Sequence, residues 1–296
     1  MINILNSIRN DKIKKVILDT DTYNEVDDQF AVAYAMLSEN IDLLSLNAAP
    51  FHNNRSTSAE DGMEKSYNEI INITSLVDPN HNIPIYKGSK TYLPDKKTPV
   101  DSPAADNIIN TVLASDELIY VVAIGAITNV ASAILKCPEI VSKMVVVWLG
   151  GHAWTSPFLR EFNMVQDVPA AQVVFDSKVP FVQLPAMGVT SDLTISIPEL
   201  EHYLRGKNKI CDYLTDIVKG YTDNPYCWSK VIWDIGTIAC LAIPSCARFN
   251  VVTTPILTNE TTYWQDYTRH HMIYVEHLYR DGVFRNLFDL LINIKD

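Results

Sequence analysis

Residues 15–37 read KVILDTDTYNEVDDQFAVAYAML and place an apolar run, an acidic cluster and a helical pattern in direct succession. The run at 15–18 is apolar after its first residue, as in a strand that is buried on both faces of a parallel sheet. The segment at 28–37 has the apolar spacing of a helix and follows after a short loop. A strand that leads into a helix is the repeating unit of α/β proteins, so this stretch predicts that fold class.

The same alternation continues outward along most of the chain. Further strands are predicted at 43–49, 118–124, 144–149 and 180–184, and less regular ones at 251–257 and 271–278. Helices are predicted at 56–73, 105–114, 128–135, 169–175, 233–242 and 283–294. Apolar strands separated by helices predict an open, mostly parallel central sheet with helices on both faces. Because no internal repeat or long linker interrupts the pattern, we expect a single domain over residues 1–296.

Composition excludes several classes of protein. The chain has 296 residues, 47% of them hydrophobic, which is enough to bury a core. Its 24 basic and 35 acidic residues give a net charge of −11, which argues against a partner made of nucleic acid or a membrane surface. The first 15 residues lack the apolar core of a secretory signal. The five cysteines form no Cys-x-x-Cys pair, so we expect buried free thiols in a cytoplasmic protein.

The acidic cluster after the first strand holds five carboxylates between Asp19 and Asp28. Like charges this close repel one another unless a cation or a set of N–H donors compensates them. Helix capping by Asp27 and Asp28 is an alternative, but it accounts for only two of the five. The candidate ligands are hard oxygens without a nearby His or Cys, which favours Ca²⁺ or Mg²⁺ over zinc.

An EF-hand and a phosphatase site are two other interpretations of the acidic cluster. An EF-hand does not fit, because its sixth position would be Asn24 rather than glycine. A phosphatase with an Asp-x-Asp nucleophile remains a competitor, although the second acidic pair that it needs late in the chain is not found. The metal site is the preferred interpretation.

Ligands of open α/β sheets bind at the carboxyl ends of the strands, and unusual residues follow three of the predicted strands. Four motifs stand in order: Asp19-Thr20-Asp21 with Asp27-Asp28; IGAITNVA at 124–131; Leu149-Gly150-Gly151 with Glu161-Phe162-Asn163; and Trp233-Asp234. Together they resemble the motifs of the calcium-dependent nucleoside hydrolases, over residues from about 15 to 242. Each motif alone is weak, but the ordered set is specific.

The resemblance implies an open α/β fold, assembly as homodimers or homotetramers, and hydrolysis of the N-glycosidic bond of ribonucleosides. It implies a Ca²⁺ ion held by the carboxylates of Asp21, Asp28 and Asp234 and by the backbone carbonyl of Ile124. Asp21 would also be the general base that activates a bound water. The substrate contacts would come from Asp19, Asn24, Asp27, Leu149, Glu161, Asn163 and Trp233.

The sequence departs from this family in three places. The loop between Asp21 and Asp27 is two residues longer than the common form, and Pro50-Phe51 replaces a Gly-Asn pair. Trp233 stands where many members have a His that serves as leaving-group acid. An indole stacks on a base but donates no strong acid proton, so purine nucleosides are slightly favoured. Trp154 or His52 is expected to lie against the base from another side.

Structural roles compete with several of these assignments. Asn129 alone is explained equally well as a helix cap, and Gly150-Gly151 as no more than a tight turn. Trp233 could point into the core. A calcium-dependent nucleoside or ribose-binding protein that has lost turnover is the alternative of a different class.

Overall fold

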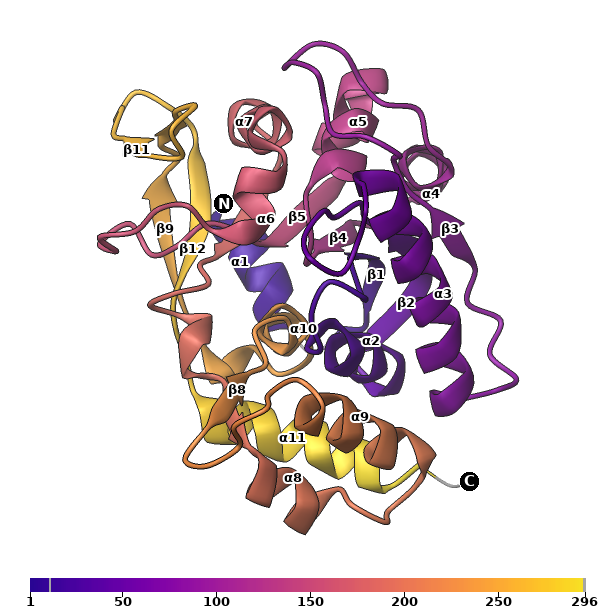
Figure 1. Cartoon of the computed structure of the whole chain (residues 1–296). Coiled ribbons are helices and arrows are strands. Elements are labelled where there is room, and N and C mark those ends of the chain that lie inside the picture. The colour runs from indigo at the N-terminus through magenta and orange to yellow at the C-terminus, as the bar shows by residue number, and fades with distance from the viewer. Residues whose placement is uncertain (11, 295–296) are drawn as a thin grey trace.

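The computed structural model describes residues 1–10 and 12–294, and its centre is an eight-stranded sheet in the order β3-β2-β1-β4-β5-β6-β12-β9 (Figure 1). In that order the strands are β3 (Ile85–Lys87), β2 (Ile41–Ala48), β1 (Lys14–Thr20), β4 (Ile119–Ala123), β5 (Met144–Leu149), β6 (Phe181–Leu184), β12 (His271–Leu278) and β9 (Ala247–Thr253). Neighbouring strands are parallel except β9, which is antiparallel to β12. The mostly parallel sheet is therefore confirmed.

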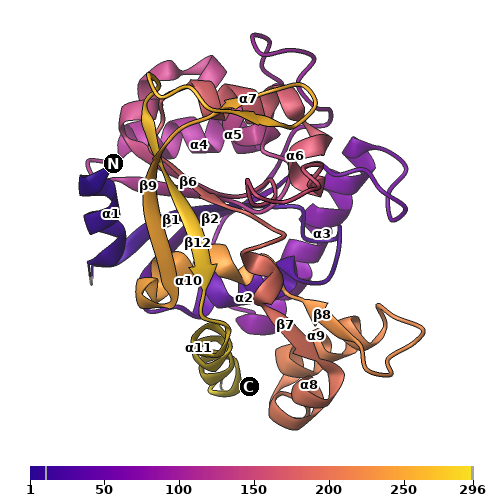
Figure 2. The same ribbon diagram turned by 90° about the vertical axis from the view of Figure 1, so that its left-hand side faces the viewer.

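Helices cover both faces of the sheet (Figure 2). One face carries α2 (Asp28–Leu37), α3 (Ala59–Val77), α10 (Ile235–Ala242) and α11 (Arg280–Ile292); the other carries α4 (Pro103–Ala114), α5 (Thr128–Lys136) and α7 (Val168–Asp176). Side chains of a strand alternate between the two cores. In β5, Val145 and Val147 pack on the first face, and Val146 and Trp148 on the second. Because each face of the sheet packs against an apolar core, the strands are continuous apolar runs in the sequence.

The elements that the sequence did not predict are short or lie outside the sheet. They are α1 (Ile2–Arg9), β3, α6 (Phe162–Gln166), α8 (Ile197–Tyr203), α9 (Lys209–Lys219), β7 (Thr194–Ser196), β8 (Ser229–Val231) and β11 (Tyr263–Trp264), together with β10 (Ile256–Leu257) as a strand separate from β9. The single strand expected at 251–257 is wrong, because it divides into β9 and β10 around Pro255. Proline has no N–H to donate to a sheet.

The prediction of buried cysteines holds for three of the five. Cys211, Cys240 and Cys246 are buried, and Cys137 is half-buried. Cys227 is exposed, so the prediction is wrong there; it lies in a turn with a φ of 54°. None of the helices in the described part of the chain is long and apolar enough to cross a membrane.

The strand order reverses between β1 and β4, and this reversal positions the site. From β1 the chain moves to β2 and β3 on one side, and from β4 it moves to β5 and β6 on the other. The helices that follow such strands diverge and leave a crevice at the carboxyl ends. The carboxyl ends of β1 and β4 are joined by a hydrogen bond, in which the backbone N–H of Ile124 donates to the carbonyl of Asp19 at 2.9 Å. Asp21 and Ile124 therefore enter the same crevice.

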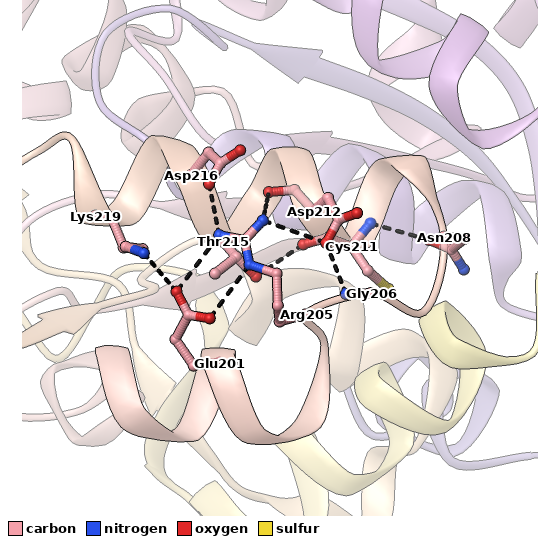
Figure 3. Close-up of polar contacts among 9 residues, drawn as sticks. All are labelled: Glu201, Arg205, Gly206, Asn208, Cys211, Asp212, Thr215, Asp216 and Lys219. Atoms are coloured by element: carbon pink, nitrogen blue, oxygen red, sulfur yellow. Dashed lines mark hydrogen bonds and ion pairs between the residues drawn. The ribbon is translucent and has the colours of Figure 1, made fainter.

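An ionic network ties α9 to α8 (Figure 3). The guanidinium of Arg205 lies 3.2 Å from Glu201, 3.2 Å from Asp212 and 2.5 Å from Asp216. Lys219 adds a second cation at 2.6 Å from Glu201. Because one guanidinium serves three carboxylates, its loss affects several contacts at once.

We predict that Arg205→Met lowers the melting temperature by roughly 2–4 °C, since a network of pairs contributes more than an isolated surface pair. The loss should shrink at about 1 M NaCl, where screening acts over about 3 Å. Lys90→Met is the matched control, because Lys90 forms a single exposed pair with Glu60. Calorimetry at low and high salt measures both variants. Equal melting temperatures for the two variants would contradict the role of the network.

Candidate metal and substrate site

Three carboxylates from two distant segments converge at the crevice. Asp27 and Asp28 stand at the start of α2, and Asp234 immediately precedes α10. One oxygen from each lies within 4.8 Å of the others, and all three side chains are buried. The structure thus brings Asp28 and Asp234 together as the motifs suggest, and it adds Asp27 to the group.

Asp21 lies beside this group and has no hydrogen-bond donor. It is fully buried, and neither carboxylate oxygen finds a partner among the described residues. A Cβ atom at Gly125 would come within 2.9 Å of Asp21 Cγ, so only glycine allows the strand end to approach the carboxylate this closely. Buried polar groups normally find partners, and an unpartnered carboxylate is especially costly. The site fits a bound cation.

Burial raises the pKa values of five carboxyl groups at the crevice, those of Asp19, Asp21, Asp27, Asp28 and Asp234. Burial raises the pKa of Asp19 to about 7, although the hydrogen bond from Asn129 lowers it. Burial and the neighbouring charge of Asp27 together raise the pKa of Asp28 to about 8. The pKa values of Asp21 and Asp234 are raised in the same way, first by burial and then by neighbouring carboxylates. A divalent cation would reverse this effect, because it stabilises the charged forms.

The helix-cap interpretation of Asp27 and Asp28 is wrong. Asp27 occupies the N-cap position of α2 but makes no capping hydrogen bond with its side chain. Its carboxylate instead accepts the backbone N–H of Trp233 at 3.1 Å, and Asp28 accepts the hydroxyl of Thr20 at 2.6 Å. Both side chains therefore face the crevice rather than the helix end.

Asn129 does not cap a helix either. It lies inside α5, where its amide donates to Asp19 at 2.9 Å and its carbonyl accepts the backbone N–H of Ser89 at 2.8 Å. Asp19 is fully buried behind the crevice, with its other oxygen unpartnered among the described residues. The expected substrate contact of Asp19 stays a prediction.

The opposite wall is built by Glu161 and Asn163. The carboxylate of Glu161 accepts three backbone N–H groups, those of Gly151, Asn163 and Met164, at 2.8–2.9 Å. The side-chain amide of Asn163 donates to the carbonyls of Ile124 and Leu149 at 3.1 and 3.0 Å. Asn163 thus joins the ends of β4 and β5. Since a carbonyl has two lone pairs, Ile124 can still bind a cation.

The glycines after β5 are more than a turn. Gly151 has a φ of 77°, which favours glycine, and a Cβ at Gly150 would meet the Trp148 ring at 2.2 Å. The turn also presents the Gly151 N–H to Glu161. It therefore fixes one side of the wall.

An inner cavity of about 190 Å³ lies between these walls. Nine of its lining residues carry predicted roles: Asn24, Asp27, Asp28, Ile124, Leu149, Glu161, Asn163, Trp233 and Asp234. The cavity is also lined by residues for which the sequence predicts no substrate contact: Glu25, His152, Phe162, Ala186 and Met187. Ala186 and Met187 follow β6, so the rule that sites form at strand ends would have pointed to them.

Two aromatic side chains do not reach this cavity as expected. Trp154 packs 4.7 Å from the Tyr274 ring, and its indole N–H donates to Gln183 at 3.2 Å. His52 is exposed and lines neither this cavity nor the outer one described next. The prediction that either lies against a base is wrong.

An outer cavity of about 800 Å³ adjoins the inner one and shares Asn24, Glu25 and Phe162 with it. Tyr213 and Tyr221 from the region of α9 line its far side. It is large enough for a complete small-molecule ligand.

The long loop between Asp21 and Asp27 forms the wall between the two cavities and is firmly anchored. Glu25 pairs with Lys230 of β8, which is buried, and its carbonyl accepts Arg55 at 2.8 Å. Asn24 accepts the amide of Asn53 at 2.6 Å. The two extra residues thus connect the acidic loop to the segment that carries Trp233.

Comparisons with known proteins find relatives of this chain in sequence and in fold. The chain is 29% identical to the pyrimidine-specific ribonucleoside hydrolase RihB of Escherichia coli over 196 residues, which cover 58% of this chain and 59% of that protein. The match thus spans less than two thirds of that relative. A solved plant nucleoside hydrolase has a TM-score of 0.78 at 19% identity, covering 95% of this chain and 99% of that one. A solved purine-preferring ribonucleoside hydrolase from Gardnerella vaginalis has a TM-score of 0.77 at 23% identity, and the match again covers 95% of this chain and 99% of that one.

A family model described as inosine-uridine preferring nucleoside hydrolase matches residues 16–282. The match extends beyond residue 242, where the motif resemblance ended, and takes in β9, β12 and the start of α11. The chain therefore belongs to the inosine-uridine preferring nucleoside hydrolase family.

Proposed function

We propose that this chain hydrolyses the N-glycosidic bond of ribonucleosides, releasing ribose and free base, with Ca²⁺ at the acidic cluster. The observation that carries the proposal is the convergence of Asp27, Asp28 and Asp234 beside the unpartnered carboxylate of Asp21. Asp21, Asp28, Asp234 and the Ile124 carbonyl would hold the ion, which is a set of hard oxygen ligands. When bound, the ion supplies an anchor for the two vicinal hydroxyls of the sugar and a polarised water.

Asp21 is the proposed general base. Its oxygens have no competing donor among the described residues, so one of them is free to accept a proton from water as that water attacks C1′. The cluster of carboxylates around it favours a sugar that gains positive charge as the bond to the base breaks.

Asp21→Asn should lower turnover by roughly 10²–10⁴-fold, because the amide keeps the shape of the side chain but accepts no proton. Steady-state kinetics on a ribonucleoside panel measure the loss, and calorimetric titration with ribose checks that the sugar still binds. Asp266→Asn is the control, since Asp266 is distant in the chain, lines neither cavity and accepts hydrogen bonds from its neighbour Thr268. Parent-like turnover in Asp21→Asn would remove the base assignment. Ribose binding without any turnover in the parent would favour the non-catalytic binding protein.

Calcium should stabilise the fold more as pH rises. The cluster carboxyls have raised pKa values, so without metal the folded chain binds more protons than the unfolded chain between about pH 4 and 8, and its stability falls as pH increases. Bound Ca²⁺ removes this loss because it needs the ionised forms. Melting temperatures with chelator or with Ca²⁺, at about pH 6 and about pH 8.5, measure the effect. A calcium shift that is smaller at the higher pH would contradict the assignment.

We further propose a preference for purine nucleosides. The half-buried indole of Trp233 lines the inner cavity beside Asp234 and offers a face on which a base can stack. A purine provides more stacking area than a pyrimidine. Two of the three similar proteins differ in this respect, since RihB of Escherichia coli is pyrimidine-specific and the hydrolase from Gardnerella vaginalis is purine-preferring.

Trp233→Ala should lower kcat/KM for inosine and guanosine roughly tenfold or more, and for uridine less, since stacking contributes on the order of 1–3 kcal/mol per base. Trp264→Ala is the control, because that indole is 68% exposed. If the parent hydrolyses uridine as efficiently as inosine and Trp233→Ala changes neither, the purine preference is wrong while the hydrolase assignment stands.

A further inference from the structure

Lys230 is a buried lysine that the chemistry proposed above does not use. It lies in β8, and only 7% of its side chain is exposed. Burying an ammonium group is costly unless other groups compensate its charge. The Glu25 carboxylate forms an ion pair with this ammonium, and the centroid of the Tyr221 ring lies 5.0 Å from it. Since moving away would leave a buried charge uncompensated, the ammonium is held in a defined position.

The ion pair joins the acidic loop to a part of the chain that lies outside the central sheet. β8 pairs with β7 in an antiparallel ladder, in which Lys230 stands opposite Ile195. These two strands lie together with α8 and α9 beyond the central sheet (Figure 2). Glu25, by contrast, belongs to the loop that follows β1 of the sheet. The pair therefore fastens the acidic loop to the β7–β8 ladder.

Each of the two joined segments leads into a proposed ligand of the cation. The acidic loop runs into α2, whose first residue is Asp28, and β8 runs through Trp233 to Asp234, which directly precedes α10. Among the described residues, neither N-cap side chain, that of Asp27 or that of Asp234, makes a capping hydrogen bond. Three kinds of contact hold the helix starts together: packing of α2 on α10, the hydrogen bond from Trp233 N–H to Asp27 at 3.1 Å, and the ion pair.

The distance between Asp28 and Asp234 has to meet a narrow requirement. Two oxygens that bind one Ca²⁺ ion at about 2.3–2.6 Å lie at most about 5 Å apart. The structure places one carboxylate oxygen of each residue within 4.8 Å of the other. Both residues therefore stand where one ion can bind them, and a movement of the two segments apart would remove a ligand.

We propose that Lys230 is a positioning residue: through Glu25 it holds the acidic loop against the segment of Asp234 and keeps the ligands at the spacing that one cation requires. The inference rests on the proposed metal site and goes beyond it, because Lys230 is not a ligand of the ion and lines neither cavity. Glu25 belongs to the extension that makes this loop two residues longer than the common form. The extension thus has a function in this chain.

The charge of Lys230 has an effect of the opposite sign, which makes the two roles separable. An ammonium close to the site repels a metal ion, so through charge alone Lys230 would weaken the binding of Ca²⁺. Its charge also lowers the pKa of Asp27 against the larger effect of burial. Removal of a residue that acted only through its charge would tighten the binding of Ca²⁺ or leave it unchanged. Removal of a positioning residue weakens it.

The test is calorimetric titration of the metal-free chain with Ca²⁺, in the parent and in three variants. Lys230→Met should weaken binding roughly 10–100-fold, as the loss of groups that orient metal ligands commonly does. Glu25→Asp keeps the negative charge but shortens the side chain, so it should weaken binding as well. Lys230→Arg keeps a cation with N–H donors and should recover part of the affinity. Melting temperatures without metal show whether each variant is folded.

Lys87→Met is the matched control. Lys87 also pairs with a carboxylate, that of Glu64, and lies 5.0 Å from the centroid of the Tyr67 ring. Its side chain is 44% exposed, however, and it lines neither cavity. Lys87→Met should therefore leave the affinity for Ca²⁺ within about twofold of the parent, because an exposed pair contributes little.

Ribose release measured against Ca²⁺ concentration gives a second readout. Lys230→Met should need more Ca²⁺ for half-maximal turnover, while its turnover at saturating Ca²⁺ changes little. Binding of Ca²⁺ by Lys230→Met at the parent's strength or tighter would overturn the inference and leave the proposed metal site standing. If Lys230→Met does not fold, parent-like binding by Glu25→Asp overturns it instead. A parent that binds no Ca²⁺ would remove the proposed site and the inference together.

Discussion

The constraint on which this structure depends is the burial of several carboxylates at one point of the sheet. The group consists of Asp19, Asp21, Asp27, Asp28 and Asp234, all at most 3% exposed. Ionised carboxylates so placed repel one another and lose their hydration, which is costly unless a cation or donors compensate them. Protein donors satisfy only part of the group, since Asp21 receives none from the described residues. A hard divalent cation is the simplest compensation, and the strand order places the group where open α/β sheets bind ligands.

Much of the surrounding structure serves to hold these groups against one another. Glycine at position 125 lets the end of β4 reach Asp21, and Asn163 joins the carbonyls at the ends of β4 and β5. The long acidic loop is fixed to β8 through Glu25 and Lys230. Lys230 is itself buried and opposes the rise in the pKa of Asp27. Positioning by packed neighbours of this kind keeps ligands in place before any substrate arrives.

The sequence predicts well whatever depends on local pattern. The apolar run of β5 and the helix α2 have the bounds expected from the sequence, because burial on both faces leaves a continuous signal in the chain. Features that depend on tertiary contacts were not predictable in this way. Trp154 turns to Tyr274 rather than to the site, and His152 and Met187 meet only because two separate turns pack together. Helices α8 and α9 lie beyond the alternating pattern and are joined through Arg205.

Calorimetric titration of the metal-free chain with Ca²⁺, in buffers of different ionisation enthalpy at neutral pH, tests the central claim most directly. The account predicts one ion per chain with release of protons, because ligands with raised pKa values must ionise to bind the ion. Asp234→Asn should weaken the binding strongly. Absence of binding, or binding without proton release that Asp234→Asn leaves unchanged, would contradict the account.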